Sequence, residues 1–305
     1  MSKYILINDL HFTGRNSKYR LGNYKEDLLL KFDEILEIAL KNAVDVLIFT
    51  GDLTETESPT YSVIDALIDR VERKKVLTYH LLGNHCLLNG SIENSEGTAL
   101  YHAIKRSSYF KYLTEINEKD HIINGIEYSI GVEQGLSEKG IYFSDENKWK
   151  IAITHCMITP KPFFKEVAHV VCKDIKTNAD IVICSHYHHP FKSKANNTEF
   201  INAGCVGRLN IDEHDIEPSV LLLDTEKRSY KIIKLKSAKA GSEIFDLTKY
   251  NELKDDKKSL SEFITSLNTV NFQKMDIVEQ ISAVCNENDI KDYLIGKTKE
   301  IKNGR

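Results

Sequence analysis

Long apolar runs, paired cysteines and a strong charge of one sign are all missing from this sequence. No apolar run approaches the roughly 20 residues that a membrane helix needs, so we expect no membrane span. The six cysteines form no C-x-x-C pair, and we expect reduced thiols, several of them acting as small buried hydrophobic residues. The net charge of −4 gives no general attraction to nucleic acid. Contacts with DNA or RNA would therefore have to come from local basic patches or from a partner.

The amino-terminal segment lacks the features of a signal peptide. Its apolar stretch, within MSKYILINDLHF, is interrupted by Asn8 and Asp9, and no small-residue cleavage site follows it. We therefore interpret this stretch as the first strand of the fold, and we expect a cytoplasmic protein. The 305 residues suffice for one large domain with a substantial core and a small appendage.

Strand-like and helix-like segments alternate over the first third of the chain. Apolar runs predict buried strands at residues 3–8, 44–49 and 76–82. Between them, residues 24–42 and 61–73 carry apolar side chains at the three- and four-residue spacing of amphipathic helices. This alternation, with short turns between the segments, is typical of a layered α/β sheet.

The remainder of the chain predicts a second set of strands and a helical tail. Strands are expected over residues 121–131, 141–153, 179–184, 200–201, 219–223 and 230–235, and a helix over residues 163–175. The two βα-rich halves together predict an α/β fold, a four-layer α-β-β-α sandwich of two mixed sheets. We assign residues 1–238 to this domain and expect residues 239–305 to form a small helical cap or interaction region, because their apolar positions recur at helical spacing.

Short motifs with metal-binding side chains follow these strands in a fixed order. They are Asp9-Leu10-His11, Gly51-Asp52, Gly83-Asn84-His85, His155 and His186-Tyr187-His188. Nearly all of them lie at the end of an apolar run that predicts a buried strand. Strand ends that bring oxygen and nitrogen ligands to one edge of a sheet can build a site for two metal ions. The ordered motifs therefore predict the hydrolysis of a phosphate ester.

This ordered set resembles the motifs of the calcineurin-like metallophosphoesterase superfamily, over about residues 1–235. The ligands that the resemblance implies are, for one metal, Asp9, His11, Asp52 and His188 and, for the other, Asp52, Asn84, His155 and His186. Asp52 would bridge the two ions, because a carboxylate has lone pairs on both of its oxygens. Mixed imidazole and carboxylate ligands suit Mn²⁺, Fe²⁺, Zn²⁺ or Co²⁺ better than Ca²⁺. We expect two divalent ions, and Mn²⁺ in particular, because similar enzymes often work best with it.

The resemblance also implies a catalytic histidine that binds no metal. His85 would donate a proton to the leaving oxygen or orient the phosphate, and Glu55, three residues after the bridging aspartate, would pair with it. The sequence departs from the family pattern at Cys86, where an acidic residue usually follows this histidine, and at Ser185, where a glycine is usual. Neither change removes a metal ligand. We interpret Cys86 as a buried thiol and not as a nucleophile, because no activating cation is evident beside it.

Features outside the core motifs resemble the SbcD-like DNA repair exonuclease subunits. A basic stretch followed by an acidic pair and a phenylalanine, over residues 15–32, resembles a segment of those nucleases. The turn over residues 204–208 resembles their Pro-Gly-Ser-x-x-Arg turn, although Ala203 and Cys205 depart from it. This resemblance implies a Mn²⁺-dependent DNA nuclease in which metal-activated water is the nucleophile. The same resemblance implies an ATPase partner subunit and a homodimer.

Two other hypotheses stay open at this level. The first is a phosphodiesterase or phosphatase that acts on nucleotides or another small phosphoester, a group whose members commonly dispense with a C-terminal cap. The second is a non-catalytic scaffold on the same fold. Such scaffolds typically lose ligands or the catalytic histidine, whereas all eight candidate positions are filled here. The sequence therefore favours an enzyme over a scaffold.

Overall fold

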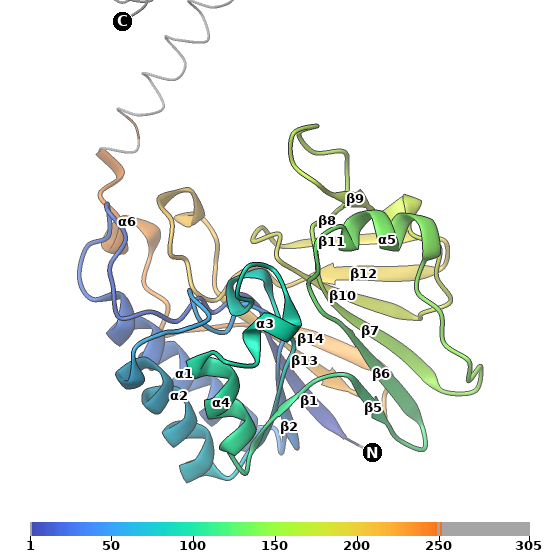
Figure 1. Cartoon of the computed structure of the whole chain (residues 1–305), viewed down its shortest axis with the longest axis horizontal. Helices are drawn as coiled ribbons and strands as arrows, with labels where there is room; N and C mark the ends of the chain where they lie inside the picture. The colour runs from blue at the N-terminus through green and yellow to red at the C-terminus, as the bar shows by residue number, and fades with distance from the viewer. Residues whose placement is uncertain (1, 249–250, 252–305) are drawn as a thin grey trace, which may run out of the picture. The chain divides into compact units, whose positions relative to one another are not determined.

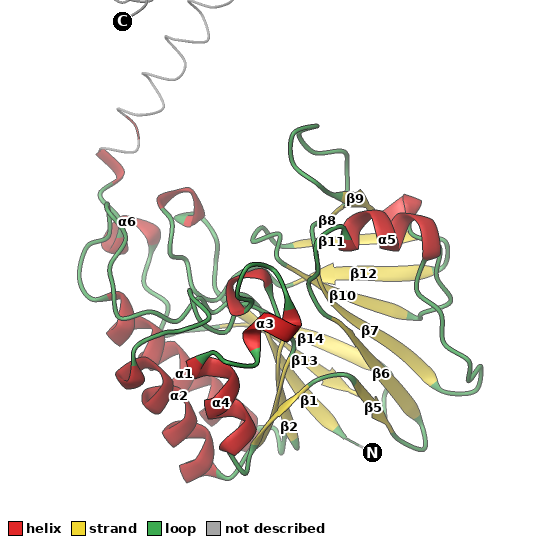
Figure 2. Ribbon diagram, in the orientation of Figure 1, coloured by secondary structure: helices red, strands yellow, loops and turns green. Residues whose placement is uncertain are grey.

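Two six-stranded mixed sheets form the body of the protein (Figure 1; Figure 2). The computed structural model describes residues 2–248 and 251, and a compact unit ends at Asp246. Apart from the short helix α6 (Gly241–Ile244), the helices expected in the C-terminal region fall outside the described residues. The domain boundary that the sequence predicts after residue 238 stays a prediction.

The first sheet contains the alternating strands of the N-terminal third. Its strands lie in the order β14-β13-β1-β2-β3-β4, with the bounds β1 Lys3–Ile7, β2 Val46–Phe49, β3 Leu77–His80, β4 Phe110–Tyr112, β13 Ser219–Asp224 and β14 Ser229–Lys234. Strands β1 to β4 run parallel, whereas β13 is antiparallel to both β1 and β14. Helices α1 (Tyr24–Lys41), α2 (Tyr61–Lys74) and α4 (Ala99–Arg106) cover the outer face of this sheet, and the short helix α3 (Ile92–Ser95) precedes α4 (Figure 1).

Helix α1 shows why a predicted element forms where it does. It begins after Asn23, whose side chain accepts a hydrogen bond of 3.3 Å from the backbone N–H of Glu26. Glu26 and Asp27 add negative charge to the first turn, where the helix dipole favours it. On the buried face, the ring of Phe32 lies 5.8 Å from that of Phe49 on β2. The cap therefore fixes the start of the helix, and the apolar stripe fixes which face meets the sheet.

The second sheet is built from the middle of the chain. Its strands lie in the order β11-β12-β10-β7-β6-β5, with the bounds β5 Glu115–Asn117, β6 His121–Ile126, β7 Trp149–His155, β10 Ile181–Ser185, β11 Phe191–Ala195 and β12 Thr198–Asn202. The central strands β6, β7, β10 and β12 run parallel, and the two edge strands run antiparallel to their neighbours. Helix α5 (Val132–Lys139) lies over its outer face (Figure 1).

The buried side chains form three apolar clusters that correspond to the layers. One lies between the two sheets and joins residues such as Leu6 and Ile48 to Ile151 and Ile183. The second packs the helices against the first sheet, and the third packs α5 against the second sheet. The predicted four-layer sandwich of two mixed sheets is therefore confirmed, although a single helix of eight residues supplies most of its second helical layer.

One predicted helix is wrong. Residues 163–169 form a loop, followed by the two-residue strand β9 (Val170–Val171), which pairs with β8 (Ile158–Thr159), and by a short 3₁₀ turn. Phe164 is 69% exposed, and the Phe163 backbone N–H donates to the His169 ring. The apolar residues recur here at helical spacing without forming a buried face, because part of the set points to solvent.

The other predicted strands are largely confirmed, with shifted ends. The segment expected over residues 141–153 becomes a strand only at Trp149, and Ile141 makes one isolated bridge with Thr177. The strand expected over residues 121–131 ends at Ile126. Among the described helices, none has both the length and the apolar character needed to cross a bilayer.

Candidate metal centre

Both sheets contribute side chains to one shared edge. The seven residues proposed as metal ligands occupy it, with Asp9 and His11 after β1, Asp52 after β2, Asn84 after β3, His155 at the end of β7, and His186 and His188 after β10. The pairs β1–β2, β2–β3 and β7–β10 are parallel, so the carboxyl ends of these strands meet at this edge. That arrangement brings together residues that are far apart in the sequence.

Four of these residues have backbone conformations that side chains other than glycine rarely adopt. The angle φ is 45° at Asp9, 48° at His11, 42° at Asp52 and 70° at His186. A left-handed conformation at such a residue costs on the order of 1–3 kcal/mol and persists only when its surroundings hold it. Four of the eleven described non-glycine residues with a positive φ are thus proposed ligands, an enrichment expected of a functional site.

Two glycines next to the ligands leave room for them. A Cβ on Gly51, where φ is 129°, would lie 1.8 Å from His155 Nδ1. A Cβ on Gly83 would lie 2.2 Å from Asp52 Oδ1. The glycines of the Gly-Asp and Gly-Asn-His motifs are therefore explained by the close approach of a neighbouring ligand to the backbone.

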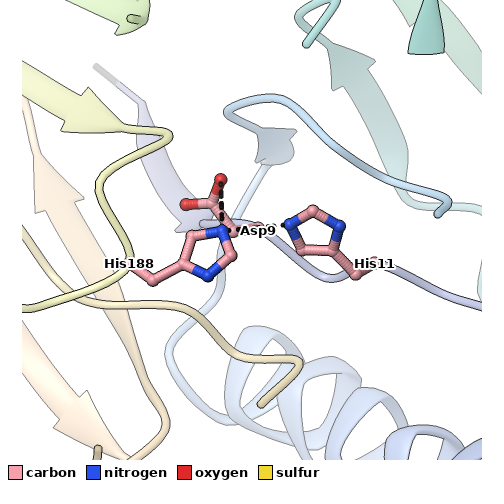
Figure 3. Close-up of side chains that lie close together, drawn as sticks. All are labelled: Asp9, His11 and His188. Atoms are coloured by element: carbon pink, nitrogen blue, oxygen red, sulfur yellow. Dashed lines mark hydrogen bonds and ion pairs between the residues drawn. The ribbon is translucent and has the colours of Figure 1, made fainter. Parts of the chain in front are cut away.

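Asp9, His11 and His188 form what we call the first cluster (Figure 3). His11 Nε2 lies 3.1 Å from His188 Nε2, which is itself 3.9 Å from Asp9 Oδ1. Glu55 accepts a hydrogen bond of 2.8 Å from His11 Nδ1, and Glu213 accepts one from His188 Nδ1. Because ionised carboxylates only accept, both Nδ1 atoms carry protons and the two Nε2 atoms face each other. Two facing lone pairs at this distance require a cation between them, either a proton or a metal ion.

Asp52, His155 and His186 form the second cluster. His155 Nε2 lies 3.1 Å from Asp52 Oδ2 and 3.2 Å from Asn84 Oδ1. Asp52 Oδ2 also lies 3.7 Å from His11 Nε2 of the first cluster. A single carboxylate oxygen therefore faces histidines of both clusters, as a ligand that bridges two metal ions would.

The polar atoms at this edge fit divalent cations. Asp9 Oδ2 and Asp52 Oδ2 are buried, and neither accepts a hydrogen bond of suitable geometry from the described residues, although His155 Nε2 lies 3.1 Å from Asp52 Oδ2. A buried carboxylate oxygen without a donor is costly, and a bound cation removes that cost. Oxygen donors from two aspartates and an asparagine, together with four imidazoles, match the preferences of Mn²⁺, Fe²⁺, Zn²⁺ and Co²⁺. The clusters can therefore hold divalent metal ions.

Electrostatics keep the shared carboxylate ionised. Burial by itself raises the pKa of Asp52, but the imidazoles of His155, His11 and His85 lower this pKa well below its usual range. The side chain is therefore a carboxylate over the whole physiological pH range. A bridging metal ligand has to be in that state.

His85 lies beside the clusters, close enough to form a further group with His11 and Asp52, although the resemblance implies that it binds no metal. Its ring centroid is 4.8 Å from that of His11, and its backbone N–H donates to Asp52 Oδ1 at 2.9 Å. Its Nδ1 donates to the backbone carbonyl of Glu55 at 2.9 Å, whereas the Glu55 carboxylate lies 3.6 Å away and bonds to His11 instead. Glu55 thus contacts both histidines, through its backbone for His85 and through its side chain for His11.

Three residues that support the clusters were not predicted from the sequence. Glu213 binds His188, and the Thr50 carbonyl and the Ser185 hydroxyl each lie 3.1 Å from His155 Nδ1. Ser185 was noted only as a departure from the family pattern. The spacing Asn210-x-x-Glu213 signals a capped turn, and this capping box is present, but it gives no sign of a partner 25 residues away.

Cys86 is the buried thiol that the sequence suggests. It is 1% exposed, and burial raises the pKa of its thiol to about 12. A thiol in this state is not a nucleophile at neutral pH. Four further cysteines among the described residues, at positions 156, 172, 184 and 205, are also buried and free.

Comparisons with known proteins bear on this site. The family model described as calcineurin-like phosphoesterase matches residues 2–190. The DNA double-strand break repair protein Mre11 of Saccharolobus solfataricus is 30% identical over 131 residues, which cover 42% of this chain and 32% of that protein. Mre11 of Thermoplasma acidophilum is 24% identical over 193 residues, covering 59% of this chain and 51% of that protein. The chain thus spans between about a third and a half of the length of these relatives.

A solved structure, described as that of a novel archaeal phosphodiesterase, aligns with 76% of this chain and 99% of its own, with a TM-score of 0.42 and 16% identity. The family match extends over more than half of the chain and includes the motifs from Asp9 to His188. The chain belongs to the calcineurin-like phosphoesterase family.

Proposed function

We propose that this protein is a Mn²⁺-dependent nuclease that hydrolyses phosphodiester bonds in DNA. The observation that carries the proposal is the convergence of six metal-binding side chains around the shared carboxylate of Asp52, with His85 beside them. The two Mre11 relatives, which are DNA double-strand break repair proteins, support DNA as the substrate. Mn²⁺ is proposed because it suits this mixture of imidazole and carboxylate donors.

The proposed ligand sets divide the site between two metal positions. Position A comprises Asp9, His11, Asp52 and His188, and position B comprises Asp52, Asn84, His155 and His186. Two bound divalent ions would activate a water molecule for attack and neutralise charge on the phosphate. His85 has its Nδ1 committed to the Glu55 carbonyl, so Nε2 is left to hold a proton for the leaving oxygen.

A cavity beside the centre supports a substrate larger than a simple phosphate. It has a volume of about 710 Å³ and is lined by Glu55 together with Arg15, Asn16 and Lys25. Arg15 and Lys25 would neutralise backbone phosphates next to the reacting bond. We propose that a nucleotide adjoining the scissile phosphodiester lies in this cavity.

A substrate panel tests the proposal. Single-stranded DNA, double-stranded DNA, a cyclic nucleotide and a chromogenic diester are each incubated with the protein and Mn²⁺, with a chelator control and the H85A variant. We expect DNA cleavage that requires both the metal and His85. Replacing Arg15 and Lys25 by alanine should weaken DNA cleavage and leave hydrolysis of the chromogenic diester unchanged. Hydrolysis of small esters without any cleavage of DNA would refute the nuclease assignment.

The alternative function is a phosphodiesterase or phosphatase acting on nucleotides or another small phosphoester. The net charge of −4 favours it, because no general electrostatic attraction holds the chain to a polyanion. The same panel separates the two functions, since the alternative predicts turnover of the cyclic nucleotide or the chromogenic diester alone.

The proposal includes two kinds of partner. One is an ATPase subunit, and the other is a second copy of this chain. Both rest on the resemblance to SbcD-like nucleases. Light scattering of the purified protein tests the homodimer, and co-purification with a candidate ATPase tests the hetero-complex.

A further inference from the structure

The histidines of the two proposed metal positions differ in what lies behind their rings. In position A, each histidine donates a hydrogen bond to a carboxylate from the ring nitrogen that faces away from the clusters. In position B, the groups nearest to the corresponding nitrogen of His155 are a carbonyl and a hydroxyl. This difference has a direct chemical consequence, because the group behind an imidazole fixes its tautomer and sets how strongly it donates to a metal.

Glu213 is the more firmly held of the two carboxylates. It is 3% exposed and closes the short 3₁₀ turn Ile211–Glu213. Its Oε1 accepts from His188 Nδ1, and its Oε2 accepts from the Asn210 backbone N–H at 2.8 Å. Both oxygens are therefore engaged, which fixes the carboxylate and, through it, the plane of the His188 ring.

Glu55 supports the other histidine of position A. Its Oε2 accepts from His11 Nδ1 at 2.8 Å, and its side chain is 29% exposed. The His11 and His188 rings are thus both held with Nδ1 protonated and Nε2 directed at the same point. Each forms the carboxylate–histidine pair that raises the basicity of a metal-ligating imidazole.

Position B has neutral supports. His155 Nδ1 lies 3.1 Å from the Thr50 carbonyl and 3.1 Å from Ser185 Oγ, and Ser185 Oγ itself lies 2.6 Å from the same carbonyl. The nearest carboxylate oxygen to His155 Nδ1 is Asp9 Oδ1, at 3.9 Å and outside hydrogen-bond distance. Within residues 2–248, no ion pair joins the His186 ring to a carboxylate, and this ring packs against Tyr128 with centroids 5.8 Å apart.

We infer that Glu213 is a positioning residue that makes position A the tighter of the two metal positions, so that the protein binds its first divalent ion at Asp9, His11, Asp52 and His188. The inference rests on the proposed metal centre and goes beyond it in assigning an order of filling. Loss of a partner behind a metal-ligating histidine typically costs about 10–100-fold in metal affinity. The expected effect of Glu213 lies in that range and falls on the first binding step.

Calorimetric titration with Mn²⁺ measures the two metal-binding steps without reference to activity. Electron paramagnetic resonance of the free ion checks the result. The wild-type chain should bind two ions in separate steps. Glu213→Gln should weaken the tighter step about 10–100-fold and leave the weaker step in place. Asp212→Asn is the matched control, because Asp212 lies on the same turn with an exposed side chain, and it should bind like the wild type.

A thermal melt checks that each variant is folded. If Glu213→Gln does not fold, Ser185→Ala gives the reciprocal test, because Ser185 supports His155 and its loss should weaken only the second step. Two equivalent sites in the wild type, or equal weakening of both steps in a folded Glu213→Gln variant, would overturn this inference and leave the metal centre intact. No binding of Mn²⁺ to the folded wild type would instead overturn the proposed metal centre itself.

Discussion

His186 and His188, one from each proposed cluster, lie in opposite electrostatic settings. Burial lowers the pKa of both His186 and His188. The hydrogen bond that His188 donates to Glu213 reverses this for His188 and raises its pKa to about 9, whereas the neighbouring His155 adds to the effect at His186, whose pKa falls to about 3. Only one residue separates these histidines in the sequence. The comparison teaches that two histidines of one motif acquire opposite properties from the charged groups around each ring.

Replacement of the residue shared by both clusters should have the largest effect. Asp52→Asn substitutes a neutral amide for the carboxylate that faces His11 and His155. We expect loss of both metals and a fall in hydrolysis of more than about 100-fold, since even a partner behind a ligand costs about 10–100-fold. Elemental analysis of the purified variant measures the metal. A variant that kept both ions and full activity would show that Asp52 is not the bridge.

Replacement of His85, the proposed proton donor, should reduce the rate nearly as much and leave metal binding unchanged. His85→Ala removes the side chain bonded to the Glu55 carbonyl and none of the proposed ligands. We expect a fall in kcat of about 100- to 10,000-fold, the range for a general acid. His102→Ala, at an exposed position on α4, serves as the control. Loss of metal in the His85 variant would instead place His85 among the ligands.

A glycine substitution tests how tightly the second cluster is packed. Gly83→Ala would place a Cβ 2.2 Å from Asp52 Oδ1, so Asp52 must move. We expect destabilisation of about 1–3 kcal/mol, typical of overpacking, together with weaker metal binding. Differential scanning calorimetry measures the stability, and Gly97→Ala, where an added Cβ meets nothing within 4 Å, is the control. Equal stability of the two variants would contradict the close packing.

The smallest expected effect is a difference between the pKa values of His188 and His186 in the metal-free protein. His188 should stay protonated up to about pH 9, and His186 should stay neutral down to about pH 3. The raised pKa of His188 contributes stability that is fully present below its unfolded value, near 6.5, and is lost as pH rises through about 9. The lowered pKa of His186 makes stability rise between about pH 3 and pH 6.5, because the unfolded chain binds the proton more readily.

Nuclear magnetic resonance of the imidazoles, with Glu213→Gln beside the wild type, measures this difference. The variant should lower the pKa of His188 and leave that of His186 in place. If both histidines of the wild type titrated together near 6.5, the two clusters would not differ in the way that their surroundings indicate.

Much of the fold was predictable because apolar runs mark buried strands and the ligands follow their ends. The strands leading to Asp9 and Asp52 are present where the sequence predicts them, and the strand leading to His155 is present although it begins only at Trp149. The helix over residues 24–42 is matched within a residue at its C-terminal end. Residues 163–175 do not form the expected helix, and the reason is physical. Apolar spacing predicts a helix only when the apolar face is buried, and Phe164 is exposed.

The partners of the ligands were much less predictable. Glu213 lies 25 residues after His188, and Thr50 lies 105 residues before His155, so only the tertiary fold brings these pairs together. Glu55 was singled out as a partner of His85, but its carboxylate bonds to His11. The sequence motifs list the atoms that face the metals, whereas the groups behind those atoms depend on how the two sheets and their loops pack.

Anomalous X-ray scattering at the manganese edge, from crystals grown with Mn²⁺, tests the central claim most directly. We predict two peaks that share Asp52, with the stronger one beside Asp9, His11 and His188 and the weaker one beside Asn84, His155 and His186. Two peaks of equal height would contradict the order of filling. The absence of any peak at these residues would contradict the metal centre.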